Sequence, residues 1–205
     1  MRHKKAINTS NFKTFSLAAL TGFLLGIPFG YGQTQAEVDS LEQVYLQGAF
    51  SPEDSLEVLS DLAAGYQDPQ KVLQYSEALI EVAQRQDSAN RLYQGYLQKG
   101  NGYIRLGNQV DALENYFEAA KYADSTGSVN RLGTIYVTIA DVYSLMENAE
   151  NSLEYYQRAI AILRNTTDTL SLATGIANAG DFFYRQGELD SALVYFEESG
   201  ALFKA

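Results

Sequence analysis

Residues 100–119 read GNGYIRLGNQVDALENYFEA, and the same kind of pattern returns 40 residues later at 140–159 and again at 180–199. Small and aromatic residues occupy fixed places in each copy. The matching columns are Gly100, Ala140 and Gly180; Tyr103, Tyr143 and Phe183; Ala112, Ser152 and Ala192; and Tyr116, Tyr156 and Phe196. A fixed period of roughly 20–50 residues indicates a solenoid, in which each repeat buries its apolar face against the next.

A weaker copy precedes these three, one residue out of step, with Leu62, Val72, Tyr75 and Ala78 in the repeat columns. No proline follows Pro69, and the sustained helical periodicity of that run predicts an all-α fold. Turn-forming residues interrupt the pattern at regular places. The sequence therefore predicts four helix pairs, 53–66 with 69–86, 89–106 with 109–125, 129–146 with 149–164, and 169–186 with 189–203.

The chain before the repeats divides into a leader and a lead-in helix. Residues 1–14 are basic and polar, residues 15–29 are apolar, and Gly30 and Gly32 follow as small residues. This layout is typical of a secretory signal peptide over 1–32, cleaved between Gly32 and Gln33. The alternatives are a retained N-terminal anchor and a buried apolar helix. We expect a lead-in helix at 33–50, a repeat domain of about four units at 51–205, and a secreted or periplasmic location.

Composition excludes several classes of function. The net charge is −10, and every acidic residue lies after residue 36. Removal of the leader leaves 11 basic against 25 acidic residues, a net charge of −14. Such a chain lacks the clustered Lys and Arg that nucleic acid or an anionic membrane surface requires, so we expect neither as a partner after signal cleavage. With no cysteine, and His3 in the leader as the single histidine, we expect no cofactor, no metal site and no enzymatic activity.

The repeat resembles the tetratricopeptide repeat family. The second copy carries the resemblance best, through Tyr96, Gly100, Tyr103, Gly107, Ala112, Leu113, Tyr116 and Ala119. Glu147 stands where the third copy would have its turn glycine, and the period is near 40 residues where the family usually has about 34. Longer repeats of this type are similar to those of bacterial peptide-sensing regulators and periplasmic sensor regions. The resemblance implies a right-handed superhelical solenoid of antiparallel helix pairs that binds a protein or peptide without catalysis.

The same resemblance implies a binding site, because the first helix of each pair lines the concave groove in this family. Transferred position by position, the peptide-binding residues are Asn101, Ile104, Arg105, Asp141, Asn178, Asp181, Tyr184 and Arg185. Asparagine can pair with backbone amides in both directions, and arginine can hold a carboxylate with two hydrogen bonds. The alternative is that these side chains form a solvated helix face. A clamp for a C-terminal carboxylate is disfavoured, because Leu97, Val137 and Ala177 replace its lysine.

The favoured function is an exported scaffold that binds a protein or peptide in its groove. One alternative is the periplasmic sensor region of a truncated signalling protein of the histidine kinase, cyclase or transcription regulator type. Another is self-association through the C-terminal repeat, because Leu202 and Phe203 would lie on an open end without the polar cap that terminal repeats need.

Overall fold

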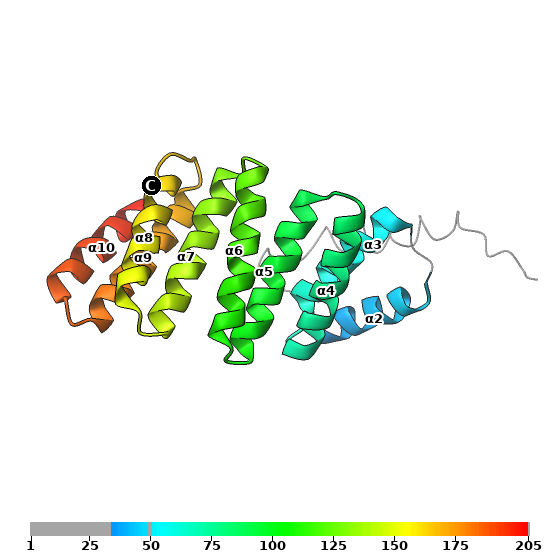
Figure 1. The fold of residues 1–205 in the computed structure, drawn as a ribbon. Helices are drawn as coiled ribbons and strands as arrows, with labels where there is room; N and C mark the ends of the chain where they lie inside the picture. The colour runs from blue at the N-terminus through cyan, green and yellow to red at the C-terminus, as the bar shows by residue number, and fades with distance from the viewer. Residues whose placement is uncertain (1–33, 49–50, 205) are drawn as a thin grey trace, which may run out of the picture. The chain divides into compact units, whose positions relative to one another are not determined.

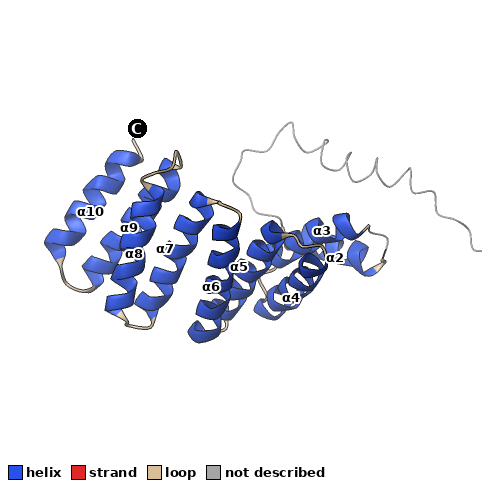
Figure 2. Cartoon of the chain, turned by 45° about the horizontal axis from the view of Figure 1, so that its top comes forward, coloured by secondary structure: helices blue, strands red, loops and turns tan. Residues whose placement is uncertain are grey.

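The computed structural model describes residues 34–48 and 51–204. Within these ranges the chain forms nine α-helices and no strand (Figure 1, Figure 2). The helices are α2 (Gln35–Leu46), α3 (Pro52–Gly65), α4 (Pro69–Arg85), α5 (Ala89–Arg105), α6 (Gln109–Ser125), α7 (Val129–Leu145), α8 (Ala149–Leu163), α9 (Thr169–Arg185) and α10 (Leu189–Leu202). The predicted signal peptide at 1–32 lies outside the described residues.

The helices from α3 onward pack as consecutive pairs, α3 with α4, α5 with α6, α7 with α8 and α9 with α10, and each pair stacks on the next (Figure 1). All eight begin and end within one residue of their predicted bounds. The lead-in helix α2 is shorter than expected, because it begins two residues later and ends four residues earlier than the span 33–50. The all-α solenoid of antiparallel helix pairs is confirmed.

Local signals explain why the helix bounds were predictable. Helices α3, α4, α6, α8 and α9 each start at a capping residue whose side chain accepts a hydrogen bond from a backbone N–H of the first turn. Within each of the last three pairs, the chain leaves the first helix through a left-handed residue. Gly107 and Gly187 have φ of 75° and 79°, and Glu147 takes φ of 57° at the equivalent place without a glycine's freedom.

The small and aromatic columns set the distance between the two helices of a pair. A Cβ atom at Gly100 would lie 2.4 Å from Cε1 of Tyr116, and one at Gly180 would lie 2.9 Å from Cδ1 of Phe196. In the third pair the small residue at this place is Ala140, which is fully buried. The predicted role of these columns in close helix packing is confirmed.

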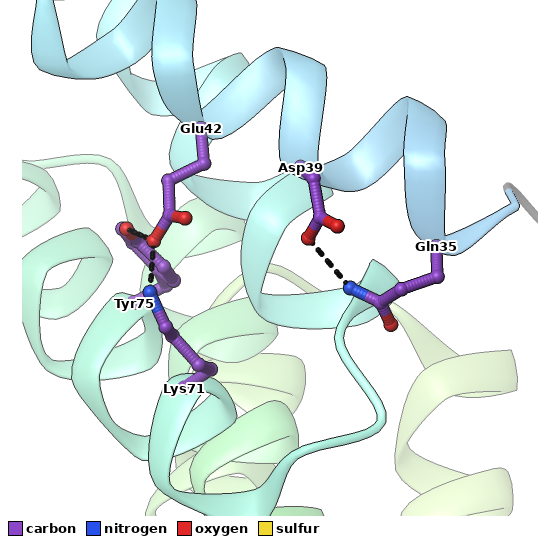
Figure 3. Close-up of polar contacts among 5 residues, drawn as sticks. All are labelled: Gln35, Asp39, Glu42, Lys71 and Tyr75. Atoms are coloured by element: carbon purple, nitrogen blue, oxygen red, sulfur yellow. Dashed lines mark hydrogen bonds and ion pairs between the residues drawn. The ribbon is translucent and has the colours of Figure 1, made fainter.

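Helix α2 covers the first pair. Its Val38 is fully buried, and the Glu42 carboxylate accepts hydrogen bonds from Lys71 and Tyr75 of α4 (Figure 3). The Lys71 ammonium also lies over the rings of Tyr66 and Tyr75, 5.4 and 5.9 Å from their centroids. Near the start of α2, Gln35 donates to Asp39 at 2.8 Å (Figure 3). None of the described helices is long and apolar enough to span a membrane.

Candidate functional site

A pocket of about 280 Å³ lies between the first helices of the third and fourth pairs, α7 and α9, with α8 contributing one side chain. Four of the eight predicted binding residues line it. The lining residues are Asp141, Ser144 and Leu145 from α7, Tyr156 from α8, and Asn178, Asp181 and Arg185 from α9. Helices α7 and α9 contact each other directly, whereas no Cα atom of α5 comes within 8 Å of one in α7. The first helices α3 and α5 also contact each other, so the pocket lies at one of the two places where neighbouring first helices touch.

Asp141 is the central polar group of the pocket. Its Oδ1 accepts a hydrogen bond from the Tyr156 hydroxyl, and the Asn178 amide donates to Oδ1 at 3.3 Å and to Oδ2 at 3.1 Å. Burial raises the pKa of Asp141, and hydrogen bonds from Tyr156 and Asn178 and the charge of Arg185 partly offset that increase. Burial also raises the pKa of Tyr156, as do the charge and hydrogen bonding of Asp141, so its hydroxyl remains a donor at neutral pH.

Asp181 and Arg185 form the rim of the pocket. Arg185 Nη2 lies 2.7 Å from Asp181 Oδ2, one helical turn away on α9. Both side chains are about half exposed, and such pairs contribute only about 0–1 kcal/mol. A ligand could therefore rearrange this pair at little cost.

The predicted residues of the second pair do not line the pocket. Asn101 accepts a hydrogen bond from the Tyr116 hydroxyl at 2.7 Å, and its amide donates to Gln98 at 3.1 Å. Arg105 Nη1 donates to the Tyr66 carbonyl oxygen at 2.8 Å, at the C-terminal end of α3. These contacts give Asn101 and Arg105 partners within the fold.

Ile104 and Tyr184 also lie outside the pocket lining, for different reasons. Ile104 is partly buried and packs against the core of the second and third pairs. Tyr184 is 60% exposed, as a residue that faces a groove would be. The eight predicted residues thus divide into four that converge at one pocket and four that do not.

Three lining residues, Ser144, Leu145 and Tyr156, are not among the eight predicted binding residues, and Tyr156 is the one that the sequence had placed in a packing column. Its aromatic column was assigned to packing, and its ring is indeed buried, but its hydroxyl reaches Asp141 fifteen positions earlier in the chain. Tyr116 makes the equivalent contact with Asn101 at the same separation, whereas the fourth copy has Phe196, which carries no hydroxyl. The pairing of a tyrosine column with a polar column was a detectable signal.

A second pocket, of about 380 Å³, lies between α6 and α8 above Tyr136 of α7. Its aromatic rings already contact a cation of the protein, because the Arg158 guanidinium lies 5.1 Å from the ring centroid of Tyr136 and 5.2 Å from that of Tyr155. Across the residues that the structure describes, no group of three or more His, Cys, Asp or Glu side chains is arranged to hold a metal ion.

Stacked helix pairs with small and aromatic packing columns define the class of tetratricopeptide-like solenoids. Residues 131–205, which contain the fourth pair and all but the first two residues of the third, match the family model described as tetratricopeptide repeat. The match covers the C-terminal part of the repeat region and agrees there with the sequence resemblance. A comparison with curated proteins found no match.

Solved structures show the same fold at low sequence identity. Aspartyl phosphate phosphatase F from Bacillus subtilis is 19% identical with a TM-score of 0.75, over 100% of this chain and 58% of that protein. A signal transduction ATPase with a tetratricopeptide repeat sensor, from Pyrococcus horikoshii, is 16% identical with a TM-score of 0.72, over 92% of this chain and 28% of that one. A Rap protein complexed with competence and sporulation factor is 13% identical with a TM-score of 0.72, over 94% and 53%. The chain thus spans between about a quarter and three fifths of these proteins, and the likeness concerns the fold alone.

Proposed function

We propose that the chain is a non-catalytic scaffold that binds a protein or peptide segment in its concave groove, across the first helices α5, α7 and α9. The observation that carries this proposal is the convergence of Asp141, Asn178, Asp181 and Arg185 on one pocket. The resemblance places all four of them in the groove by their position in the repeat. A merely solvated helix face would not be expected to bring four of the eight predicted residues together around one cavity.

The chemistry of the pocket suits an extended segment. Asp141, Asp181 and Ser144 supply acceptors, while Arg185, Asn178 and Ser144 supply donors, so both kinds of backbone group can find a partner. Exposed Tyr184, on the same helix as Asn178 and Arg185, adds an aromatic surface. Specificity would then depend on a few side chains from each repeat, carried by rigid helices.

The proposal is tested by filling the pocket. Ser144→Trp places a large ring among the lining residues, and Ala161→Trp makes a comparable change at an exposed position of α8. A displayed library of random peptides is selected on the purified protein, and the affinities of the selected peptides are measured for each variant. We expect Ser144→Trp to weaken binding about tenfold or more, which corresponds to about 1.4 kcal/mol. Equal binding by both variants, with unchanged helicity, would remove the pocket from the function.

Export is part of the proposal, and the layout of residues 1–32 supports it. The mature protein is expected to begin at Gln33. Mass spectrometry of the N-terminal peptide, from protein recovered outside the cytoplasm, checks this directly. An intact N-terminus at residue 1 on exported protein would favour the retained anchor.

A second candidate concerns the last helix. Exposed apolar side chains gather on α10 and at its C-cap, including Leu193, Val194, Phe196 and Phe203. In the preceding pairs the positions equivalent to Leu193, Phe196 and Phe203 are buried or partly buried, whereas the position of Val194 is exposed there too. This observation supports either self-association through the C-terminal repeat or the sensor region of a longer signalling protein. Sedimentation of the purified protein separates these alternatives: a dimer that Leu193→Glu dissociates supports self-association, and a monomer at high concentration opposes it.

A further inference from the structure

The equivalent first helices differ at one pair of positions. Each carries a polar residue in the same column and a second residue one helical turn later. These pairs are Asn101 with Arg105, Asp141 with Leu145, and Asp181 with Arg185. On α9 the acidic residue therefore has a basic neighbour. On α5 the residue in the same column is a neutral amide, and it also has a basic neighbour. Only in α7, among these three helices, is a carboxylate followed by an apolar side chain.

The hydrogen bonds of Asp141 do not supply the positive charge that an arginine provides at this place on α5 and α9. Both carboxylate oxygens accept from uncharged groups, the Tyr156 hydroxyl and the Asn178 amide. Across the described ranges, no Lys or Arg nitrogen lies within 4.0 Å of this carboxylate, and Arg185 is paired with Asp181. Carboxylates removed from water are usually paired with a cation. The pocket thus contains a negative charge that the protein itself leaves without an ion pair.

The surroundings of Asp141 also favour a cation. The charged or titratable groups near it are Tyr116 from α6, Tyr156 from α8, and Asp181 and Arg185 from α9, which together with Asp141 sum to one negative charge. Ser144 and Leu145 lie in the last turn of α7, and Arg185 ends α9, so the negative ends of two helix dipoles point to this region. Burial raises the pKa of Asp141, as expected for a carboxylate whose charge is incompletely compensated.

The size of the pocket indicates how much of a partner can enter. At about 280 Å³ it is smaller than the roughly 300–1,000 Å³ typical of sites that hold a whole small molecule. One long side chain of a larger partner is the better match. Lys and Arg combine an apolar stem, which can lie along Leu145, with a charged end that can reach Asp141.

We propose that Asp141 anchors one cationic side chain, a Lys or Arg of the bound segment, in the pocket between α7 and α9. This inference rests on the proposed function, because it names the chemistry that the groove selects. Asp181 on the rim provides a second carboxylate for the same cation. Asn178 and Tyr156 are positioning residues, which hold the Asp141 carboxylate toward the pocket.

The main experiment compares two substitutions that remove one negative charge each. Asp141→Asn acts in the pocket, and Asp124→Asn acts at an exposed position of α6 outside it. The probe is an array of synthetic peptides of varied sequence, all acetylated and amidated so that only side chains carry charge. We expect the captured peptides to share a Lys or Arg, and Asp141→Asn to weaken their binding about tenfold or more while Asp124→Asn leaves it unchanged. Capture without dependence on a cation, or without an effect of Asp141→Asn, would overturn the inference and leave the proposed function standing.

A second variant tests the same idea by adding a charge. Leu145→Arg gives Asp141 the basic neighbour that Asp181 has in Arg185, one turn along the same helix. The new guanidinium is expected to occupy the pocket and to weaken binding of cationic peptides as strongly as Asp141→Asn does. Cationic peptides that bind this variant as well as they bind the wild type would contradict the assignment.

Small probes distinguish a side-chain cation from a free α-amine as the bound group. They also test the cation site independently of the proposed function. N-acetyl-lysine methylamide and N-acetyl-arginine methylamide carry a side-chain cation, and glycine methylamide carries a free α-amine. The expected result is that the first two shift the NMR signal of the Asn178 side-chain amide in the wild type but not in Asp141→Asn. A response to glycine methylamide alone would overturn the side-chain assignment, and no response to any probe would overturn the cation site. A response without any peptide capture would support the cation site and contradict the proposed function.

Discussion

Glycine 100 shows how one residue sets the spacing of a helix pair. A Cβ atom there would lie 2.4, 2.6 and 2.9 Å from three atoms of the Tyr116 ring. That ring is almost fully buried, and its hydroxyl is held by Asn101, so it has little room to move. Gly200, in α10, has no atom within 4 Å of the position that a Cβ would occupy. The two helical glycines therefore offer a matched comparison.

We predict opposite effects of alanine at these two positions. Gly100→Ala should lower the free energy of unfolding by about 1–3 kcal/mol, because the new methyl group overpacks the interface with Tyr116. Gly200→Ala should raise it by about 0.5 kcal/mol, because alanine is the better helix former. Urea titrations followed by circular dichroism measure both changes. A neutral Gly100→Ala would show that the two helices of the pair can separate without cost.

Tyr156 illustrates a second feature at the residue scale. Its buried ring belongs to the packing column, while its hydroxyl belongs to the binding pocket. Replacement of the tyrosine by phenylalanine in the fourth copy, at Phe196, keeps the packing role and loses the polar one. The same column can thus serve structure in every repeat and recognition in selected repeats.

Among the elements, α2 is joined to the first helix pair by the polar contact of Glu42 with Lys71 and Tyr75. The Lys71 ammonium and then the Tyr75 hydroxyl hold the pKa of Glu42 well below its ordinary value of 4.5, at about 2. The charged form of Glu42 is therefore favoured in the folded state. Together with buried Val38, this contact fixes α2 on the first helix pair (Figure 3).

The lowered pKa has a defined consequence for stability against pH. Because the pKa is depressed on folding, the contribution of Glu42 is present above about pH 4.5 and is lost as the pH falls towards about 2. Glu42→Gln should cost about 1–2 kcal/mol at neutral pH, as expected for hydrogen bonds to a charged group. The difference between the wild type and Glu42→Gln should shrink as the pH falls from about 4.5 towards 2, because Glu42 is protonated first in the unfolded chain and only near pH 2 in the folded protein.

Urea titrations at several pH values test this prediction, with Glu114→Gln as the control. Glu114 is an exposed acid on α6, so its substitution makes the same charge change away from α2. Should both variants follow the same pH dependence, the contact of Glu42 with α4 would not stabilise the fold. Amide hydrogen exchange of α2 adds a local readout, because one end of a solenoid can open independently of the rest.

At the scale of the whole molecule, the excess of acidic residues is the dominant electrostatic feature. The net charge is −10, and all 25 acidic residues lie after residue 36. Several ion pairs of the described residues, including Arg85 with Glu81 and Arg158 with Glu154, are on the surface and contribute little. Salt weakens both the repulsion among the carboxylates and the attraction within the surface ion pairs. Because the acidic residues are in excess, the relief of repulsion should outweigh the weakening of the pairs.

We predict that NaCl stabilises the protein between low and physiological ionic strength. An increase of about 1 kcal/mol in the free energy of unfolding would raise the melting temperature by roughly 2–4 °C. Thermal melts at increasing NaCl concentration measure the effect. The double variant Glu114→Gln with Glu197→Gln, which removes two exposed charges, should respond less to salt. A melting temperature that falls with salt would mean that ion pairs dominate.

Most of the fold could be read from the sequence because its determinants are local. Capping residues, turn residues and the proline starts act within about one helical turn, and they placed eight helices within one residue of their bounds. The left-handed turn at Glu147 is an exception, since only the repeat register, and no glycine, indicated it. The candidate site was predicted only in part, because repeat position says which helix face a residue occupies but not which neighbour it meets.

The sequence by itself determined the helix pairs, their period, the packing columns and the set of first-helix residues from which the candidate site is drawn. Only the tertiary structure decided that Arg105 turns back to the Tyr66 carbonyl and that Asp141 meets Tyr156 and Asn178. The physical reason is that caps and periodicity depend on neighbours along the chain. The pocket instead depends on how closely α7, α8 and α9 approach one another, and that distance is the sum of many packing contacts.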